Sequence, residues 1–146
     1  MLNSDFKEFV ELLNANTVEY LVVGGYALSA YGRPRYTGDI DFWVRPSPAN
    51  ARKILKVLKE FGMESLGVTE DTFSKPDQIL QIGYEPSRID VLTSIDGVEF
   101  EDCYARRFET IYSGVLVQFI GIDDFKRNKA ATGRLKDQAD IKDLEA

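Results

Sequence analysis

The segment from Asp39 to Val44 constrains the fold most, because acidic and apolar residues alternate along it. Residues two apart on an extended strand project to the same face, about 6 to 7 Å apart along the chain. Asp39 and Asp41 therefore share one face with Trp43, while the apolar residues between them take the other face. The alternation predicts a strand whose apolar side lies on the core and whose acidic side borders a cleft.

The remaining hydrophobic pattern predicts alternating helices and strands. Helices are expected over residues 4–14 and 27–31, from Pro48 to Gly62, over 100–107, from 123 to 133 and from about 136 onwards, with Ser4 and Asp123 as N-caps. Strands are expected over residues 20–23, 39–44, 78–84, 88–95, 109–112 and 115–120. Residues 64–77 are polar, lack a clear period and are expected to form a loop. The order favours an α+β fold, with a mixed β-sheet and helices packed mainly on one side.

Length and composition favour one intracellular domain. A chain of 146 residues without repeats or flexible linkers is expected to form a single domain over residues 1–146, with a helical C-terminal segment at about 122–146. The single cysteine cannot form an internal disulfide and no secretory segment is evident, so a cytoplasmic location is expected. The longest uncharged stretch, Tyr20 to Gly32, is too short to span a bilayer, so no membrane partner is expected.

The absence of histidine excludes several catalytic mechanisms. The chain cannot build a Ser-His-Asp triad, a Cys-His dyad or a histidine metal site from its own residues. Any catalysis must rely on carboxylates, lysine, tyrosine, the single cysteine or a bound metal. The net charge of −6 argues against a broad surface for nucleic acid.

Asp39 and Asp41 could bind a metal ion. Two carboxylates about 4 Å apart repel each other by roughly 1 kcal/mol in water-like surroundings and by roughly 4 kcal/mol at an effective dielectric near 20. A shielded pair would therefore require a counter-cation, and oxygen ligands suit a hard ion such as Mg²⁺. For Asp-x-Asp taken alone, a solvated strand edge without an ion is the competing interpretation.

Asp90 provides a third acidic residue inside a predicted apolar strand. An acid in such a place usually has a partner or a task. An ion pair with Arg88 is the alternative, which we disfavour because neighbouring side chains of a strand face opposite ways.

Gly24 and Gly25 separate an apolar strand from a short helix. Backbone N–H groups at such a turn can approach a phosphate without interference from side chains, although a simple tight turn is the alternative. The glycines match neither a dinucleotide-binding nor a Walker-type fingerprint. Arg33 and Arg35, which follow the short helix, could contact phosphate oxygens or serve as ordinary surface charge.

These segments together resemble the DNA polymerase β-like nucleotidyltransferase superfamily, and within it the small bacterial members, which include minimal nucleotidyltransferases and AbiEii-type toxin-related proteins. The resemblance rests on Val22-Val23-Gly24-Gly25-Tyr26-Ala27, on Arg33-Pro34-Arg35-x-Thr37-x-Asp39-Ile40-Asp41-Phe42-Trp43-Val44 and on the later acid Asp90. It extends to the tail, Asn128-Lys129-Ala130-Ala131-Thr132-Gly133-Arg134-x-Lys136-Asp137-x-x-Asp140.

The resemblance implies that Asp39, Asp41 and Asp90 are catalytic and hold two Mg²⁺ ions, with Mn²⁺ as an alternative. Asp90 is then the candidate general base. The implied substrate-binding residues are Gly24, Gly25, Arg33, Arg35, Thr37, Lys129 and Lys136. A salt-bridged helix face is the alternative for Lys129, because acidic residues balance the tail.

The implied function is Mg²⁺-dependent transfer of a nucleoside monophosphate from a nucleoside triphosphate to a protein or RNA hydroxyl, with a toxin–antitoxin component as one expected role. A non-catalytic nucleotide-binding or partner-binding module with the same fold is the alternative. A third hypothesis is a subunit that pairs with an antitoxin or with a helical partner protein, which would select the acceptor.

Overall fold

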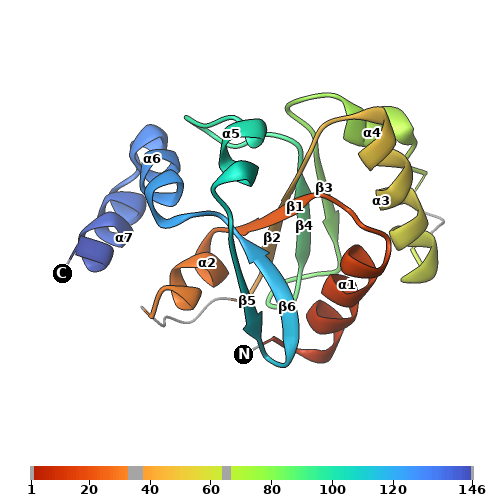
Figure 1. Cartoon of the computed structure of the whole chain (residues 1–146), viewed down its shortest axis with the longest axis horizontal. Helices are drawn as coiled ribbons and strands as arrows, with labels where there is room; N and C mark the ends of the chain where they lie inside the picture. The colour runs from red at the N-terminus through yellow and green to blue at the C-terminus, as the bar shows by residue number, and fades with distance from the viewer. Residues whose placement is uncertain (1, 33–37, 64–66, 146) are drawn as a thin grey trace.

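A computed structural model describes residues 2–32, 38–63 and 67–145 of the chain (Figure 1). Its elements are α1 (Ser4–Ala15), β1 (Tyr20–Val23), α2 (Gly25–Ala30), β2 (Ile40–Val44), α3 (Pro48–Glu60), α4 (Glu70–Ser74), β3 (Ile79–Ile82), β4 (Ile89–Leu92), α5 (Phe100–Ala105), β5 (Phe108–Tyr112), β6 (Val115–Phe119), α6 (Ile122–Thr132) and α7 (Leu135–Glu145). No helix within the described ranges has the length and apolar character needed to cross a membrane.

The strands form one mixed six-stranded sheet in the order β3-β4-β2-β1-β6-β5. β2 runs parallel to β4 and antiparallel to β1, while β1 runs parallel to β6. β3 and β5 each pair with one antiparallel neighbour at an edge of the sheet. The expected α+β fold with a mixed sheet is confirmed.

The two faces of the sheet are covered differently. On one face, Phe9 of α1 packs against Phe42 at 5.3 Å between ring centroids, and also against Phe61 at the end of α3, at 5.2 Å. On the other face, Trp43 is fully buried against Phe100 of α5, at 5.1 Å. The two longest helices thus lie together on the apolar side predicted from the alternation in β2 (Figure 1). The opposite face bears the carboxylates, and α5 covers the part of it around Trp43.

The predicted loop over residues 64–77 is wrong in part, because it contains α4. Thr69 and Thr72 form a capping box at the start of this helix, and Phe73 is buried. Residues 64–66 lie outside the described ranges. A helix of one turn is too short to show a hydrophobic period, and it is stabilised here by packing against α3.

Two predicted N-caps are also wrong. Asn3 caps α1 in place of Ser4, since its side chain accepts a hydrogen bond from the N–H of Phe6 at 2.8 Å. Gly121 precedes α6 in place of Asp123. The other predicted helices and strands are confirmed, with bounds that differ by a few residues.

Asn50 in α3 fixes the end of the β1–β2 pair that lies away from the carboxylates. Its buried side chain accepts the N–H of Glu19 at 2.9 Å and donates to the carbonyls of Glu19 and Arg45 at 3.0 and 3.1 Å. Both amide donors and the amide oxygen are therefore used. Asn50 connects the residue before β1 to the residue after β2.

We expect Asn50→Asp to lower the free energy of unfolding by about 3 kcal/mol at pH 7, because a buried carboxylate would replace an amide that donates to two carbonyls. Urea denaturation followed by circular dichroism measures the change. Asn3→Asp is the matched control: a carboxylate caps a helix N-terminus as well as an amide does, so its effect should be small. Equal effects of the two substitutions would contradict this role for Asn50.

Candidate active site

The acidic residues of two neighbouring parallel strands meet at one end of the sheet. Asp41 of β2 is aligned with Asp90 of β4, and paired strands lie about 4.8 Å apart. Asp39 immediately precedes β2, and its carboxylate accepts the backbone N–H of Arg88 at 3.1 Å. The structure therefore brings together the three carboxylates predicted from the sequence.

These carboxylates border an open cleft of about 640 Å³. The ends of β1, β2 and β4 form one wall, and the C-terminal helices α6 and α7 form another. The lining residues are Gly24, Gly25, Gly38, Asp39, Asp41, Glu85, Pro86, Arg88, Asp90, Lys129, Arg134, Lys136, Asp137 and Asp140.

Gly24 lies where a side chain would collide with the site. It follows Val23, which is paired with Asp41 across β1 and β2. A Cβ atom on Gly24 would lie 2.5 Å from Oδ2 of Asp41, and the backbone φ of +71° also disfavours any other residue. The glycine therefore allows the Asp41 carboxylate to lie against the backbone between β1 and α2.

Burial raises the pKa of Asp41 to about 7, and repulsion from Asp90 acts in the same direction. Asp39 adds a smaller effect of the same sign, whereas the positive charge of Lys129 lowers the pKa. The cleft thus concentrates negative charge around a poorly solvated carboxylate, which favours the binding of a cation.

Arg88 supplies one such cation. Its Nε and Nη2 atoms donate to the two carboxylate oxygens of Asp90 at 2.7 and 3.1 Å, and Nη2 lies 3.2 Å from Oδ2 of Asp39. The Arg88–Asp90 ion pair, which we disfavoured from the sequence, is therefore present. The two residues are two positions apart on a strand and share a face, just as Asp39 and Asp41 do.

Lys129 of α6 is nearly buried at the edge of the cleft. Its ammonium nitrogen lies 3.2 Å from Oδ1 of Asp137, which is itself fully buried in α7. Asp137 also accepts hydrogen bonds from the hydroxyl of Thr132 and, at 2.6 Å, from Nε of Arg134. Although burial alone would raise it, these contacts hold the pKa of Asp137 below its ordinary value. Lys129 therefore both forms an ion pair within the tail and faces the cleft.

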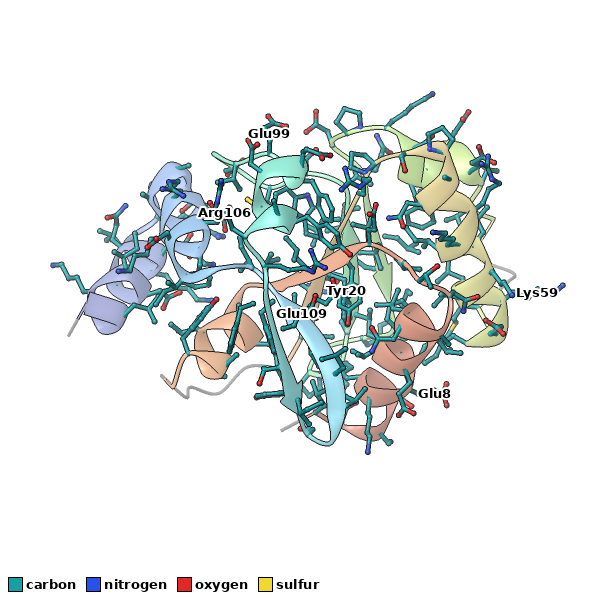
Figure 2. The ribbon with its side chains drawn as sticks, viewed as in Figure 1. Glu8, Tyr20, Lys59, Glu99, Arg106 and Glu109 are labelled. Carbon is teal, nitrogen blue, oxygen red and sulfur yellow. The ribbon has the colours of Figure 1, made fainter. Side chains whose placement is uncertain are left out.

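The position of α6 is fixed by contacts with the segment around α5. Arg106, which follows α5, lies between α5 and α6 (Figure 2). It donates twice to the buried Asp124 of α6, at 3.0 and 2.9 Å, and Arg127 donates to the same carboxylate at 2.7 Å. Asn128 donates to the carbonyl of Asp96 at 2.9 Å. These bonds hold the helix that carries Lys129 against the rest of the fold.

The other predicted substrate-binding residues are only partly placed. Gly24, Gly25 and Lys136 line the cleft, whereas Arg33, Arg35 and Thr37 lie outside the described residues.

Arg88 and Asp137 are among the cleft residues that were not predicted as site residues. Spacing along the strand could have identified Arg88. No local pattern distinguishes Asp137 from the other acids of the tail, because its burial depends on how α7 packs against α6.

The donor atoms at this site fit a hard divalent cation. Three carboxylates provide only oxygen ligands, and the absence of a side chain at Gly24 leaves room for one of them, that of Asp41. Yet among the described residues no group of three or more His, Cys, Asp or Glu side chains is already arranged to hold a metal ion. In the arrangement observed, the guanidinium of Arg88 supplies the positive charge that contacts Asp39 and Asp90.

We predict that Asp41→Asn stabilises the metal-free protein at alkaline pH. Folding raises the pKa of Asp41 from 3.8 to about 7, so the folded state binds this proton more tightly, and stability is lost as the pH rises from 3.8 to about 7. The variant should be more stable than the native chain by up to about 4 kcal/mol at pH 8, and little different at pH 4. Urea denaturation in the presence of EDTA measures both values.

Asp71→Asn, which changes an exposed carboxylate of α4, is the control and should leave the pH dependence unchanged. If Asp41→Asn has the same effect at pH 4 and at pH 8, the pKa of Asp41 is not raised on folding.

Comparison with known proteins identifies both a family and a fold. The model of the family described as "Nucleotidyl transferase of unknown function (DUF2204)" matches residues 3–146. No curated protein sequence matches at a significant level. A candidate nucleotidyltransferase from Thermotoga maritima has a similar structure, with a TM-score of 0.64 and 15% identity over 93% of this chain and 87% of the other.

A second similar structure is that of the lincosamide antibiotic adenylyltransferase LnuA with lincomycin bound. Its TM-score is 0.60, with 15% identity over 100% of this chain and 98% of the other. At this identity, both likenesses concern the fold alone. The family match covers nearly the whole chain and confirms the resemblance to nucleotidyltransferases, so the chain belongs to the nucleotidyl transferase family DUF2204.

Proposed function

We propose that this protein transfers a nucleoside monophosphate from a nucleoside triphosphate to an acceptor hydroxyl, with release of pyrophosphate. The observation that carries the proposal is the alignment of Asp41 with Asp90, next to Asp39 and Gly24, at one end of the sheet. Family membership and the fold of the two similar structures support it independently.

Asp39, Asp41 and Asp90 are the residues that would hold Mg²⁺, with two ions proposed and Mn²⁺ as an alternative. When bound, Mg²⁺ supplies positive charge that binds the triphosphate and stabilises the leaving pyrophosphate. The raised pKa of Asp41 implies that a divalent cation would replace a proton on this carboxylate at neutral pH.

The remaining cleft residues would bind and orient the nucleotide. Gly24 and Gly25 offer open backbone on which phosphate oxygens can lie. Lys129 and Lys136 bring positive charge to the cleft from α6 and α7. Asp90 is the proposed general base that accepts the proton of the acceptor hydroxyl, which requires that Arg88 first release its carboxylate.

For the acceptor we propose a hydroxyl of a protein or an RNA, with the chain acting as the toxin of a toxin–antitoxin pair. A second protein, either an antitoxin or a helical partner subunit, would then control or complete the site. A cytoplasmic location belongs to the same proposal. Because LnuA is described as acting on a lincosamide antibiotic, a small-molecule hydroxyl is included among the acceptors to be tested.

One observation favours the alternative of a non-catalytic nucleotide-binding module. Arg88 forms a bidentate pair with Asp90, the proposed base and metal ligand. If this pair persisted with nucleotide bound, the chain would bind nucleotide without turnover. Labelling of an acceptor distinguishes the two functions.

We expect the purified protein, incubated with each α-³²P-labelled nucleoside triphosphate and Mg²⁺, to label a component of total RNA, cell lysate or a small-molecule panel that contains lincomycin. Labelling should stop with EDTA and fall at least a hundredfold in Asp41→Asn, because an uncharged amide neither binds the cation as strongly nor offsets its charge. Asp71→Asn should label as well as the native chain. Nucleotide binding without labelling of any acceptor would favour the non-catalytic module.

We also expect Gly24→Ala to weaken binding of the Mg²⁺–nucleoside triphosphate complex at least tenfold, because the new methyl group would displace the Asp41 carboxylate. Gly32→Ala is the matched control, since Gly32 has a similar φ of +81° but, among the described residues beyond its chain neighbours, no atom within 4 Å of its Cβ position. Thermal-shift titration with nucleotide and Mg²⁺ measures both variants. If the two variants lose the same affinity, backbone strain is the cause, and the proposed contact with Asp41 is contradicted.

A further inference from the structure

Arg88 is held in the cleft by carboxylates from three segments of the chain. It forms the bidentate pair with Asp90 of β4, lies 3.2 Å from Asp39 before β2, and lies 3.2 Å from Glu85 in the turn between β3 and β4. Two of these three acids are proposed metal ligands. The guanidinium therefore competes with a divalent cation for the oxygens of these two carboxylates.

Binding of the Arg88 guanidinium and binding of a divalent cation oppose each other at Asp90. Both oxygens of the Asp90 carboxylate accept hydrogen bonds from one guanidinium. This bidentate pair is a strong interaction that already offsets the negative charge of the carboxylate. A cation approaching Asp90 would also meet the positive charge of Arg88 at close range, where partial burial weakens screening by water. Metal binding at Asp39 and Asp90 is therefore stronger when the guanidinium moves away.

The backbone of Arg88 is fixed while its side chain can move. Its N–H donates to Asp39 and its carbonyl accepts the N–H of Ile40 at 3.0 Å, which fixes the main chain at the β2–β4 junction. The side chain, by contrast, is 23% exposed and lies in an open cleft. A change of rotamer would release Asp90 while these backbone hydrogen bonds stay in place.

We propose that Arg88 is an internal counter-cation that keeps divalent metal out of the nucleotide-free site and pairs with the triphosphate when nucleotide binds. The inference rests on the proposed function and adds a regulatory device to it. A guanidinium pairs with phosphate in the same bidentate manner as with carboxylate, so the incoming nucleotide offers Arg88 a replacement partner. Metal and nucleotide then bind together, and the site binds metal weakly when no nucleotide is bound.

The first test is the affinity of the nucleotide-free protein for Mn²⁺, measured by electron paramagnetic resonance of the unbound ion. Arg88→Gln should bind Mn²⁺ at least tenfold more tightly than the native chain, because it frees Asp90 and removes a positive charge. Arg88→Lys, which keeps the charge but loses the bidentate geometry, should lie between the two. Arg107→Gln, which alters an arginine paired with Glu109 on the surface, is the matched control and should bind like the native chain.

The second test is the coupling between metal and nucleotide, measured with α,β-methylene nucleoside triphosphates in the presence and absence of Mn²⁺. The factor by which Mn²⁺ tightens nucleotide binding should be about tenfold smaller in Arg88→Gln than in the native chain, since coupling between two ligands is reciprocal. Association of Mn²⁺ with nucleotide in solution is common to both proteins and cancels in the comparison.

Equal or weaker Mn²⁺ binding by Arg88→Gln, with its circular dichroism spectrum unchanged, would overturn the inference while leaving the proposed metal site intact. If Arg88→Gln does not fold, Arg88→Lys decides by the same criterion. Failure of every form to bind Mn²⁺, with or without nucleotide, would overturn the inference and also the metal-dependent function on which it rests.

Discussion

The parallel pairing of β2 with β4 places Asp41 beside Asp90 and so concentrates negative charge at one point. Other residues of the site offset this charge. The backbones of both residues are fixed, because each belongs to a hydrogen-bonded strand inside the sheet. Burial of Asp41 then makes its ionisation costly, as its raised pKa reflects. A pair of this kind destabilises the fold at neutral pH unless cations lie close to it.

Among the basic residues that line the cleft, Arg88 and Lys129 act on its carboxylates from different directions. Arg88 comes from the start of β4 and binds Asp90 and Asp39 directly. Lys129 comes from α6 and acts on Asp41 at longer range, while Asp137 of α7 holds its ammonium group. The helical tail is therefore part of the electrostatic balance of the site, and the Arg106–Asp124 contact that anchors α6 contributes to it indirectly.

Much of the fold could be predicted, because it depends on local pattern. The alternation in β2 and the apolar run of β1 gave strands close to those observed, and Asp39 and Asp41 were correctly placed on one face. The predictions failed where packing or capping over a few residues decided the outcome: α4 depends on the burial of Phe73, and α1 begins at the cap formed by Asn3. The ion pair of Arg88 with Asp90 was missed through an error in strand geometry rather than through lack of information.

By itself, the sequence determined the strands, the acidic side of β2 and the exclusion of histidine chemistry, because these depend on residue type and on spacing of a few positions. Only the tertiary structure decided that Asp90 lies beside Asp41, that Gly24 lies against its carboxylate, and that Lys129 and Asp137 close the cleft from the far end of the chain. Those relations join residues tens of positions apart. These relations depend on the order of strands in the sheet and on the anchoring of α6. No local sequence pattern encodes the strand order or the anchoring.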